Sequence, residues 1–184
     1  MIWKVIAFGV GSAILIFISR LSLRDPRSHG FPRFFAWEAL LALLLLNLEH
    51  WFENPLAWYQ CIAWILLVAC IVPLVWGTLL LNTRGKPVEK RAEDPKLLTF
   101  EKTTSLVKTG IYKYIRHPLY SSLLLLAWGI FFKFPSWAGI GLAALATFFL
   151  LLTARADEAE CTRFFGPAYQ EYTQKTRRFI PFLF

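Results

Sequence analysis

The sequence predicts an all-α integral membrane protein with about five transmembrane helices. Of its 184 residues, 57% are hydrophobic and the mean hydropathy is +0.48, which is too apolar for an ordinary soluble domain of this length. The apolar residues are gathered into five blocks, and about 20 apolar residues are enough for a helix to cross the hydrocarbon core. Nearly all basic residues lie between these blocks or after the last of them, as they do in membrane proteins.

The five expected spans differ in length and in how they are joined. The first ends in arginines rather than in the small residues of a cleavage site, so we expect it to be retained. Pro73 is expected to kink the third. The fourth is short, and the "KFPSW" turn after it predicts a tight helical hairpin with the fifth. The spans are expected at residues 2–20, 34–52, 56–81, 118–133 and 136–154.

The distribution of lysine and arginine predicts the orientation of the chain. Cytosolic loops carry the excess of these residues, and all twenty except Lys4 and Lys133 belong to the first loop, the third loop or the C-terminal part. We therefore expect the N-terminus outside and the C-terminus in the cytosol. The long polar segments, residues 82–117 and 155–184, would then face the cytosol and hold the chemistry. A short interfacial helix is expected around residues 95–100.

Composition and spacing argue against two other classes of site. The net charge of +8 could suit nucleic acid, but the basic residues form no patch interleaved with aromatic side chains. The three cysteines are an odd number, and two of them lie inside an apolar block, so they indicate neither a disulfide framework nor a metal site. We expect no nucleic-acid partner and no metal.

The stretch "GIYKYIRHPLY", residues 110–120, places charged and titratable side chains at the start of the fourth span. Pro118 fits the first turn of a helix, so His117 lies at the helix mouth and Tyr120 one turn inside. Free N–H groups at a helix start favour an anionic group, and Arg116 adds a permanent charge. Arginine and tyrosine also anchor helices at the lipid interface, which leaves a purely structural role open.

A second cluster begins where the fifth span is expected to leave the membrane. Asp157, Glu158 and Glu160 lie close together on one helix, which Gly166 and Pro167 end before another helix starts. These acids could complete a pocket with the mouth of the fourth span. They could equally form a solvated helix face that pairs with neighbouring arginines.

Together the two clusters resemble a family of membrane enzymes. "SLVKTGIYKYIRHPLY", a helical hairpin, an acidic pair and "FFGPAYQEYTQKTRRFIP" follow one another as in the integral-membrane methyltransferases that include isoprenylcysteine carboxyl methyltransferase, with the phospholipid N-methyltransferases as relatives. The resemblance covers roughly residues 97–182. We expect a single membrane domain, residues 1–184, in which three spans (1–81) precede a cofactor-binding loop, the hairpin and the C-terminal helices (82–184).

The resemblance implies methyl transfer from S-adenosylmethionine to a membrane-embedded amphiphilic acceptor, either a prenylcysteine carboxylate or a lipid. The cofactor would lie on the cytosolic side, between the loop before the fourth span, the mouth of that span and the helix after the fifth. Arg155 or Arg116 would face the substrate. Cofactor contacts are expected from Thr104, Ser105, Leu106, Val107, Tyr112, His117, Pro118, Leu119, Tyr120, Asp157 and Glu158.

The residue types also suit this chemistry independently of the resemblance. Asp157 or Glu158 could bind the ribose hydroxyls or the ammonium of the cofactor, and Arg116 or the helix mouth its carboxylate. Methyl transfer is an in-line displacement, to which a protein contributes mainly alignment and exclusion of water. A carboxylate acceptor needs no base, whereas an amine must lose a proton, and His117 is the only base that the sequence indicates near the site.

Two other functions remain open at this point. A membrane reductase of the sterol type has comparable RHP and tyrosine features but uses a nicotinamide cofactor and has more spans. A non-catalytic scaffold or sensor would keep the fold while being free to lose His117, Tyr120 and the acids.

Overall fold

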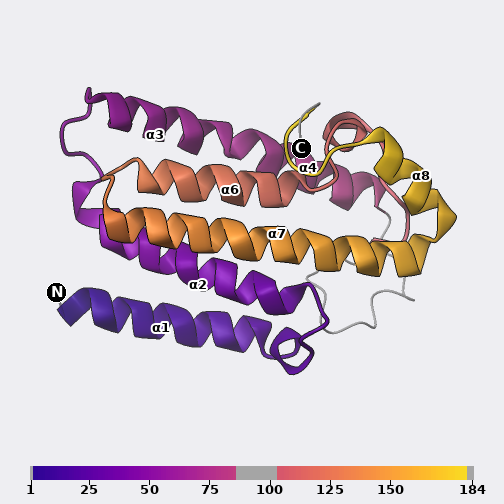
Figure 1. Cartoon of the computed structure of the whole chain (residues 1–184), viewed down its shortest axis with the longest axis horizontal. Helices are drawn as coiled ribbons and strands as arrows, with labels where there is room; N and C mark the ends of the chain where they lie inside the picture. The colour runs from indigo at the N-terminus through magenta and orange to yellow at the C-terminus, as the bar shows by residue number, and fades with distance from the viewer. Residues whose placement is uncertain (1, 86–102, 182–184) are drawn as a thin grey trace.

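The computed structural model describes residues 2–85 and 103–181, and it is built from long helices that run side by side (Figure 1). Four helical segments are long and apolar enough to cross a membrane, and a fifth, shorter apolar helix lies among them. The prediction of an all-α multi-pass membrane protein is confirmed. The interfacial helix expected around residues 95–100 lies outside the described residues. The α-helices are α1 (Ile2–Ser19), α2 (Gly30–Asn47), α3 (Trp58–Ala69), α4 (Ile71–Arg84), α6 (Pro118–Phe131), α7 (Trp137–Phe165) and α8 (Pro167–Lys175).

The third span is made of two helical pieces. Helix α3 ends at Ala69 and α4 begins at Ile71. Pro73 has no N–H to donate, and its ring clashes with the carbonyl group four residues earlier, which is that of Ala69. The kink expected at Pro73 therefore takes the form of a break at Cys70.

The last two spans form the expected hairpin, but α7 is much longer than the sequence indicates. Its start is capped by Ser136, whose side chain accepts a hydrogen bond from the N–H of Gly139 at 3.1 Å. It ends at Gly166, which has a φ of 58° that favours glycine, and Pro167 then starts α8. The 29 residues of α7 reach about 43 Å, beyond the hydrocarbon thickness of about 30 Å. The acidic cluster at residues 157–160 is therefore carried by the same rigid helix that forms the fifth span.

Small side chains allow the central helices to approach closely. Ala36 and Ala39 of α2 are buried, as are Ala143 and Ala146 of α7, and they belong to the hydrophobic clusters between these helices and α6. Alanine at such contacts is typical of helix packing in membranes. Helices α2, α6 and α7 therefore form a closely packed core. The polar end of this core positions the site.

A buried lysine holds the opposite end of the bundle together. Lys133, in the turn between α6 and α7, is fully buried, and its Nζ donates to Gln60 Oε1 at 2.9 Å and to the Trp51 carbonyl at 3.2 Å. The same ammonium lies 3.3 Å from the ring centre of Trp64, a cation–π contact. The charge is therefore satisfied by protein groups and joins the α6–α7 turn to α3.

Candidate active site

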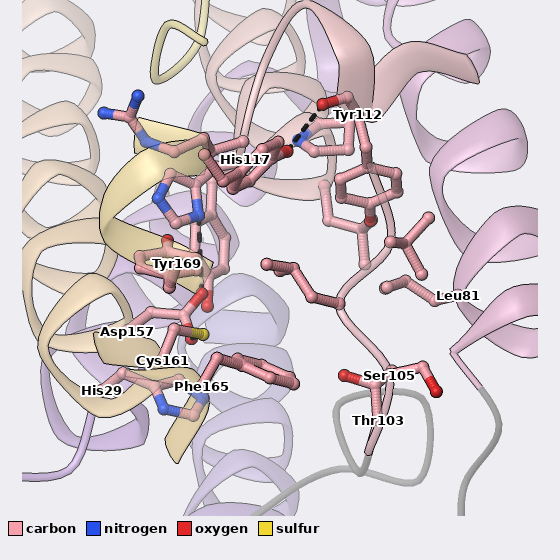
Figure 2. A pocket seen from close by; sticks show the side chains of 17 residues that line it. His29, Leu81, Thr103, Ser105, Tyr112, His117, Asp157, Cys161, Phe165 and Tyr169 are labelled. Carbon is pink, nitrogen blue, oxygen red and sulfur yellow. Dashed lines mark hydrogen bonds and ion pairs between the residues drawn. The ribbon is translucent and has the colours of Figure 1, made fainter. Parts of the chain in front are cut away.

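A pocket lies at the end of the bundle where α6 begins and α7 ends (Figure 2). Its cavity volume is about 110 Å³, and it is partly open to solvent. Its walls come from α4, the segment before α6, the first turn of α6, the ends of α7 and α8, and the residue before α2. The lining residues are His29, Leu81, Thr103, Ser105, Leu106, Val107, Tyr112, Arg116, His117, Pro118, Leu119, Tyr120, Asp157, Cys161, Phe165, Tyr169 and Tyr172.

The C-terminal segment holds the residues before α6 in place through backbone hydrogen bonds. The N–H of Arg116 donates to the carbonyl of Arg177 at 2.8 Å, and the N–H of His117 donates to the carbonyl of Arg178 at 3.1 Å. One turn inside α6, Ser121 Oγ donates to the carbonyl of Phe179 at 2.9 Å. The mouth of α6 is thus fixed by chain that lies about 60 positions further on.

Glu158 is the centre of a partly buried ion-pair cluster. Its Oε1 accepts hydrogen bonds from Arg116 Nε at 2.9 Å, and its Oε2 accepts from Arg178 Nη2 at 2.8 Å. His117 Nε2 lies 3.3 Å from Oε1. The side chain of Glu158 is 14% exposed and does not line the pocket. Its two arginine partners and His117 already use the hydrogen-bonding capacity of both oxygens.

Asp157, the neighbouring acid, faces the pocket instead. Its Oδ2 lies 3.4 Å from His117 Nδ1, and its Oδ1 accepts a weak hydrogen bond from Cys161 Sγ at 3.6 Å (Figure 2). The ring of His117 also stacks on Tyr120, with ring centres 5.4 Å apart. Burial alone would lower the pKa of His117, but the hydrogen bonds to Asp157 and Glu158 outweigh it and raise the pKa above the ordinary 6.5.

This raised pKa predicts how stability depends on pH. A group whose pKa is raised on folding stabilises the protein fully below its unfolded pKa, and the contribution is lost as pH rises through the folded pKa. We expect the unfolding temperature of the ligand-free protein to fall as pH rises above about 6.5. In a His117→Gln variant this dependence should be much flatter. Thermal unfolding in detergent between pH 5.5 and 9 measures it, and equal slopes in both proteins would contradict the assignment.

Tyrosines form an aromatic wall on the side of α8. Tyr169 and Tyr172 are buried, and the Tyr172 hydroxyl donates to the carbonyl of Tyr112 at 2.6 Å. Burial raises the pKa of all three tyrosines. They therefore remain neutral phenols at physiological pH and serve as apolar walls with hydrogen-bonding tips.

The structure brings most of the expected site residues to this one pocket. Three of them do not line it: Thr104, Glu158 and Arg155. The N–H of Thr104 donates to the carbonyl of Gly85 at 3.0 Å, and Arg155 is exposed on α7. The expected residues that do line it are Ser105, Leu106, Val107, Tyr112, Arg116, His117, Pro118, Leu119, Tyr120 and Asp157.

Several residues of the site were not expected from the sequence. Tyr169 and Tyr172 are two of them, although their i,i+3 spacing places them on one helix face. Cys161 lies one turn after Asp157, a spacing that could have indicated a shared face. No local sequence pattern indicates that His29 or Arg178 belongs to the site. The former lines the pocket, and the latter completes the Glu158 cluster.

Fold and site together define a class of protein: a multi-pass membrane protein with a pocket at one end of its helices. Residues 96–168, less than half of the chain, match the model of a family described as phospholipid methyltransferase. Comparisons with curated proteins and with solved structures gave no significant match. The matched segment is a phospholipid methyltransferase domain, within the superfamily of membrane methyltransferases that also holds the isoprenylcysteine carboxyl methyltransferases.

The chain is therefore an S-adenosylmethionine-dependent membrane methyltransferase. The match favours methyl transfer over the reductase and the non-catalytic scaffold that the sequence left open. The superfamily expected from the two motifs is confirmed. Within it, the match is to the phospholipid methyltransferases, which the sequence indicated as relatives, rather than to the carboxyl methyltransferase in particular.

Proposed function

We propose that the pocket binds S-adenosylmethionine and that the enzyme methylates the amine headgroup of a membrane lipid. One observation carries the choice of acceptor. The charge of Arg116 is used by Glu158, whereas the carboxylate of Asp157 faces the pocket. The pocket is thus suited to a cationic head rather than to an anionic one.

The lining residues fit the parts of the cofactor. Asp157 offers a carboxylate for the ribose hydroxyls or the ammonium, and Thr103 and Ser105 offer hydroxyl groups. Apolar and aromatic side chains, including Leu106 and Phe165, form a slot for the adenine. Because Glu158 pairs with Arg116, little unbalanced positive charge opposes the sulfonium.

A carboxylate acceptor, as in a prenylcysteine, would need a cation to hold it. Arg116 binds Glu158 and also donates Nη1 to the carbonyl of Thr173 at 3.1 Å, which occupies its guanidinium. Arg155, the other candidate, is exposed and lies outside the pocket wall. The carboxylate of Asp157, by contrast, suits an ammonium, whether of the cofactor or of the acceptor. We therefore favour the amine.

The acceptor can reach the pocket while its tail stays among lipids. Leu81 of α4 lines the pocket, and other apolar side chains of the same helix, such as Leu74, Trp76 and Leu79, are exposed. Exposed apolar surface on a spanning helix is solvated by acyl chains. We also propose that this end of the bundle faces the cytosol, because the basic segments flank it.

The cofactor supplies a methyl group on a positively charged sulfur. The protein's contribution is to orient the reactants and to exclude water from them. His117, held between Asp157 and Glu158, fixes the mouth of α6, and the buried tyrosines close the side of α8. These residues align the reactants, but they do not by themselves remove a proton from the acceptor.

Transfer of a labelled methyl group to defined vesicles tests the proposal. The purified protein is reconstituted with labelled cofactor in vesicles containing phosphatidylethanolamine, phosphatidylglycerol or a farnesylcysteine. We expect alkali-stable label on the ethanolamine lipid alone. Label found as an alkali-labile methyl ester on the farnesylcysteine would contradict the amine assignment, and so would equal labelling of phosphatidylglycerol.

A further inference from the structure

The end of α4 presents an exposed arginine, Arg84, that lies outside the matched family segment. Its Nη1 donates to Thr109 Oγ1, in the segment before α6, at 2.6 Å, and both residues are exposed. Within residues 2–85 and 103–181, no carboxylate pairs with Arg84. A guanidinium has five N–H donors and a permanent charge, so this one hydrogen bond leaves donors for an anionic ligand.

The pair formed by Arg84 and Thr109 lies at the rim of the pocket. Leu81, one turn before Arg84 on α4, lines the pocket. Thr109 is two positions after Val107, which also lines it. Leu81 lies across the pocket from Asp157 (Figure 2). A ligand whose anionic group meets Arg84 can therefore extend a cationic group into the pocket, toward the wall that carries Asp157.

The position of Arg84 along its span matches the level of lipid headgroups. The helical segment from Trp58 to Arg84 has 27 residues, which is about 40 Å of helix and close to the thickness of a bilayer with its headgroups. Trp76 and Leu79, earlier on α4, are exposed apolar side chains that acyl chains would solvate. A lipid lying along α4 would therefore bring its phosphate to Arg84.

A phosphodiester is the anionic group that this pair suits. A guanidinium binds phosphate through two parallel N–H···O hydrogen bonds, and a threonine hydroxyl can donate a further one. Arg116 and Arg178, by contrast, are held by Glu158. In an ethanolamine lipid only a short carbon bridge joins the phosphate to the amine. A phosphate held at the rim thus leaves the amine inside the pocket.

We propose that Arg84, oriented by Thr109, binds the phosphate of the acceptor and so selects amine lipids that carry a phosphodiester. This rests on the proposed function, because it concerns the acceptor of that same reaction. The phosphate is remote from the nitrogen that is methylated, so it is held equally before and during methyl transfer. Such uniform binding lowers KM and leaves kcat unchanged.

An Arg84→Gln variant tests this role in dodecyl maltoside micelles, whose detergent carries no phosphate. We expect KM for phosphatidylethanolamine to rise about tenfold, as for the loss of one charged hydrogen bond, while kcat changes less than about twofold. KM for sphingosine, an amine lipid without phosphate, should stay at the wild-type value. The dissociation constant of S-adenosylhomocysteine, measured by calorimetry, should also stay unchanged.

Three further variants separate the specific contact from charge and folding effects. Arg84→Lys keeps the charge and should recover most of the affinity for phosphatidylethanolamine. Thr109→Val removes only the hydroxyl and should raise KM by about threefold, within the range for one neutral hydrogen bond. Arg163 is the matched control, since it is an exposed arginine near the end of α7 whose Nε donates to the Ala159 carbonyl at 3.3 Å. Arg163→Gln should keep the wild-type KM.

The outcomes separate this inference from the proposed function. If wild-type protein methylates phosphatidylethanolamine and Arg84→Gln keeps its KM, the phosphate assignment alone is wrong. An equal rise of KM for sphingosine, or an equal rise in Arg163→Gln, would also overturn it, because the effect would not depend on phosphate or on this arginine. A wild-type protein that is inactive on sphingosine would agree with selection by phosphate. If wild-type protein methylates only the farnesylcysteine carboxylate, both proposals fail.

Discussion

Replacing Glu158 with glutamine is expected to abolish cofactor binding and to lower the unfolding temperature. The change leaves Arg116 and Arg178 without their shared carboxylate at the mouth of α6. Breaking a buried ion pair by removing one partner costs about 3–5 kcal/mol. Because Arg178 is 31% exposed, we expect the lower end of this range. Calorimetry with S-adenosylhomocysteine and thermal unfolding in detergent measure the two effects.

A Glu171→Gln variant is the control for this experiment. Glu171 pairs with Lys175 at 2.5 Å on the exposed face of α8, four residues apart. Both side chains are solvated, so the change should leave affinity and unfolding temperature unchanged. Wild-type affinity in the Glu158→Gln protein would mean that the cluster does not organise the pocket.

Replacing Asp157 with asparagine should weaken cofactor binding and should destabilise the fold less than Glu158→Gln does. Its carboxylate faces the pocket, and asparagine has nearly the same shape. Loss of a charged hydrogen bond costs about 1.5–3 kcal/mol, which corresponds to a 10- to 100-fold rise in the dissociation constant. We expect that rise for S-adenosylhomocysteine by calorimetry, with a smaller change in unfolding temperature than in Glu158→Gln.

The two acids are adjacent in sequence, so the comparison between them is informative. Asp157 is 24% exposed and points into the cavity, whereas Glu158 points toward arginines. A Glu53→Gln variant, at the far end of the bundle, controls for the loss of a carboxylate as such. Unchanged affinity in Asp157→Asn would place the cofactor away from this wall.

The spans could be predicted because hydropathy is a local property of the chain. Each apolar block corresponds to one helix, except the third, which forms α3 and α4. The break between these two, near Pro73, follows from the chemistry of proline. The end of α7 could not be placed in the same way. Hydropathy falls at Arg155, but the backbone hydrogen bonds of a helix do not require apolar side chains, so α7 continues to Phe165.

The site was predictable where its residues share a local motif and not where they meet through packing. His117 and Asp157 each belong to a recognisable stretch, and the hairpin between α6 and α7 brings the two together. His29 reaches Glu160 from 131 positions away. Arg178 reaches Glu158 only because the C-terminal segment folds back on residues 114–117. No local pattern of residue types encodes such contacts.

The structure of the protein bound to S-adenosylhomocysteine tests most directly whether two distant stretches of chain enclose the cofactor. We predict density for the nucleoside between the 103–112 segment and the end of α7, with a polar group of the ligand within hydrogen-bonding distance of Asp157. A nucleoside bound at the Lys133 end of the bundle, or on an outer face of α7 remote from Tyr112, would contradict that arrangement.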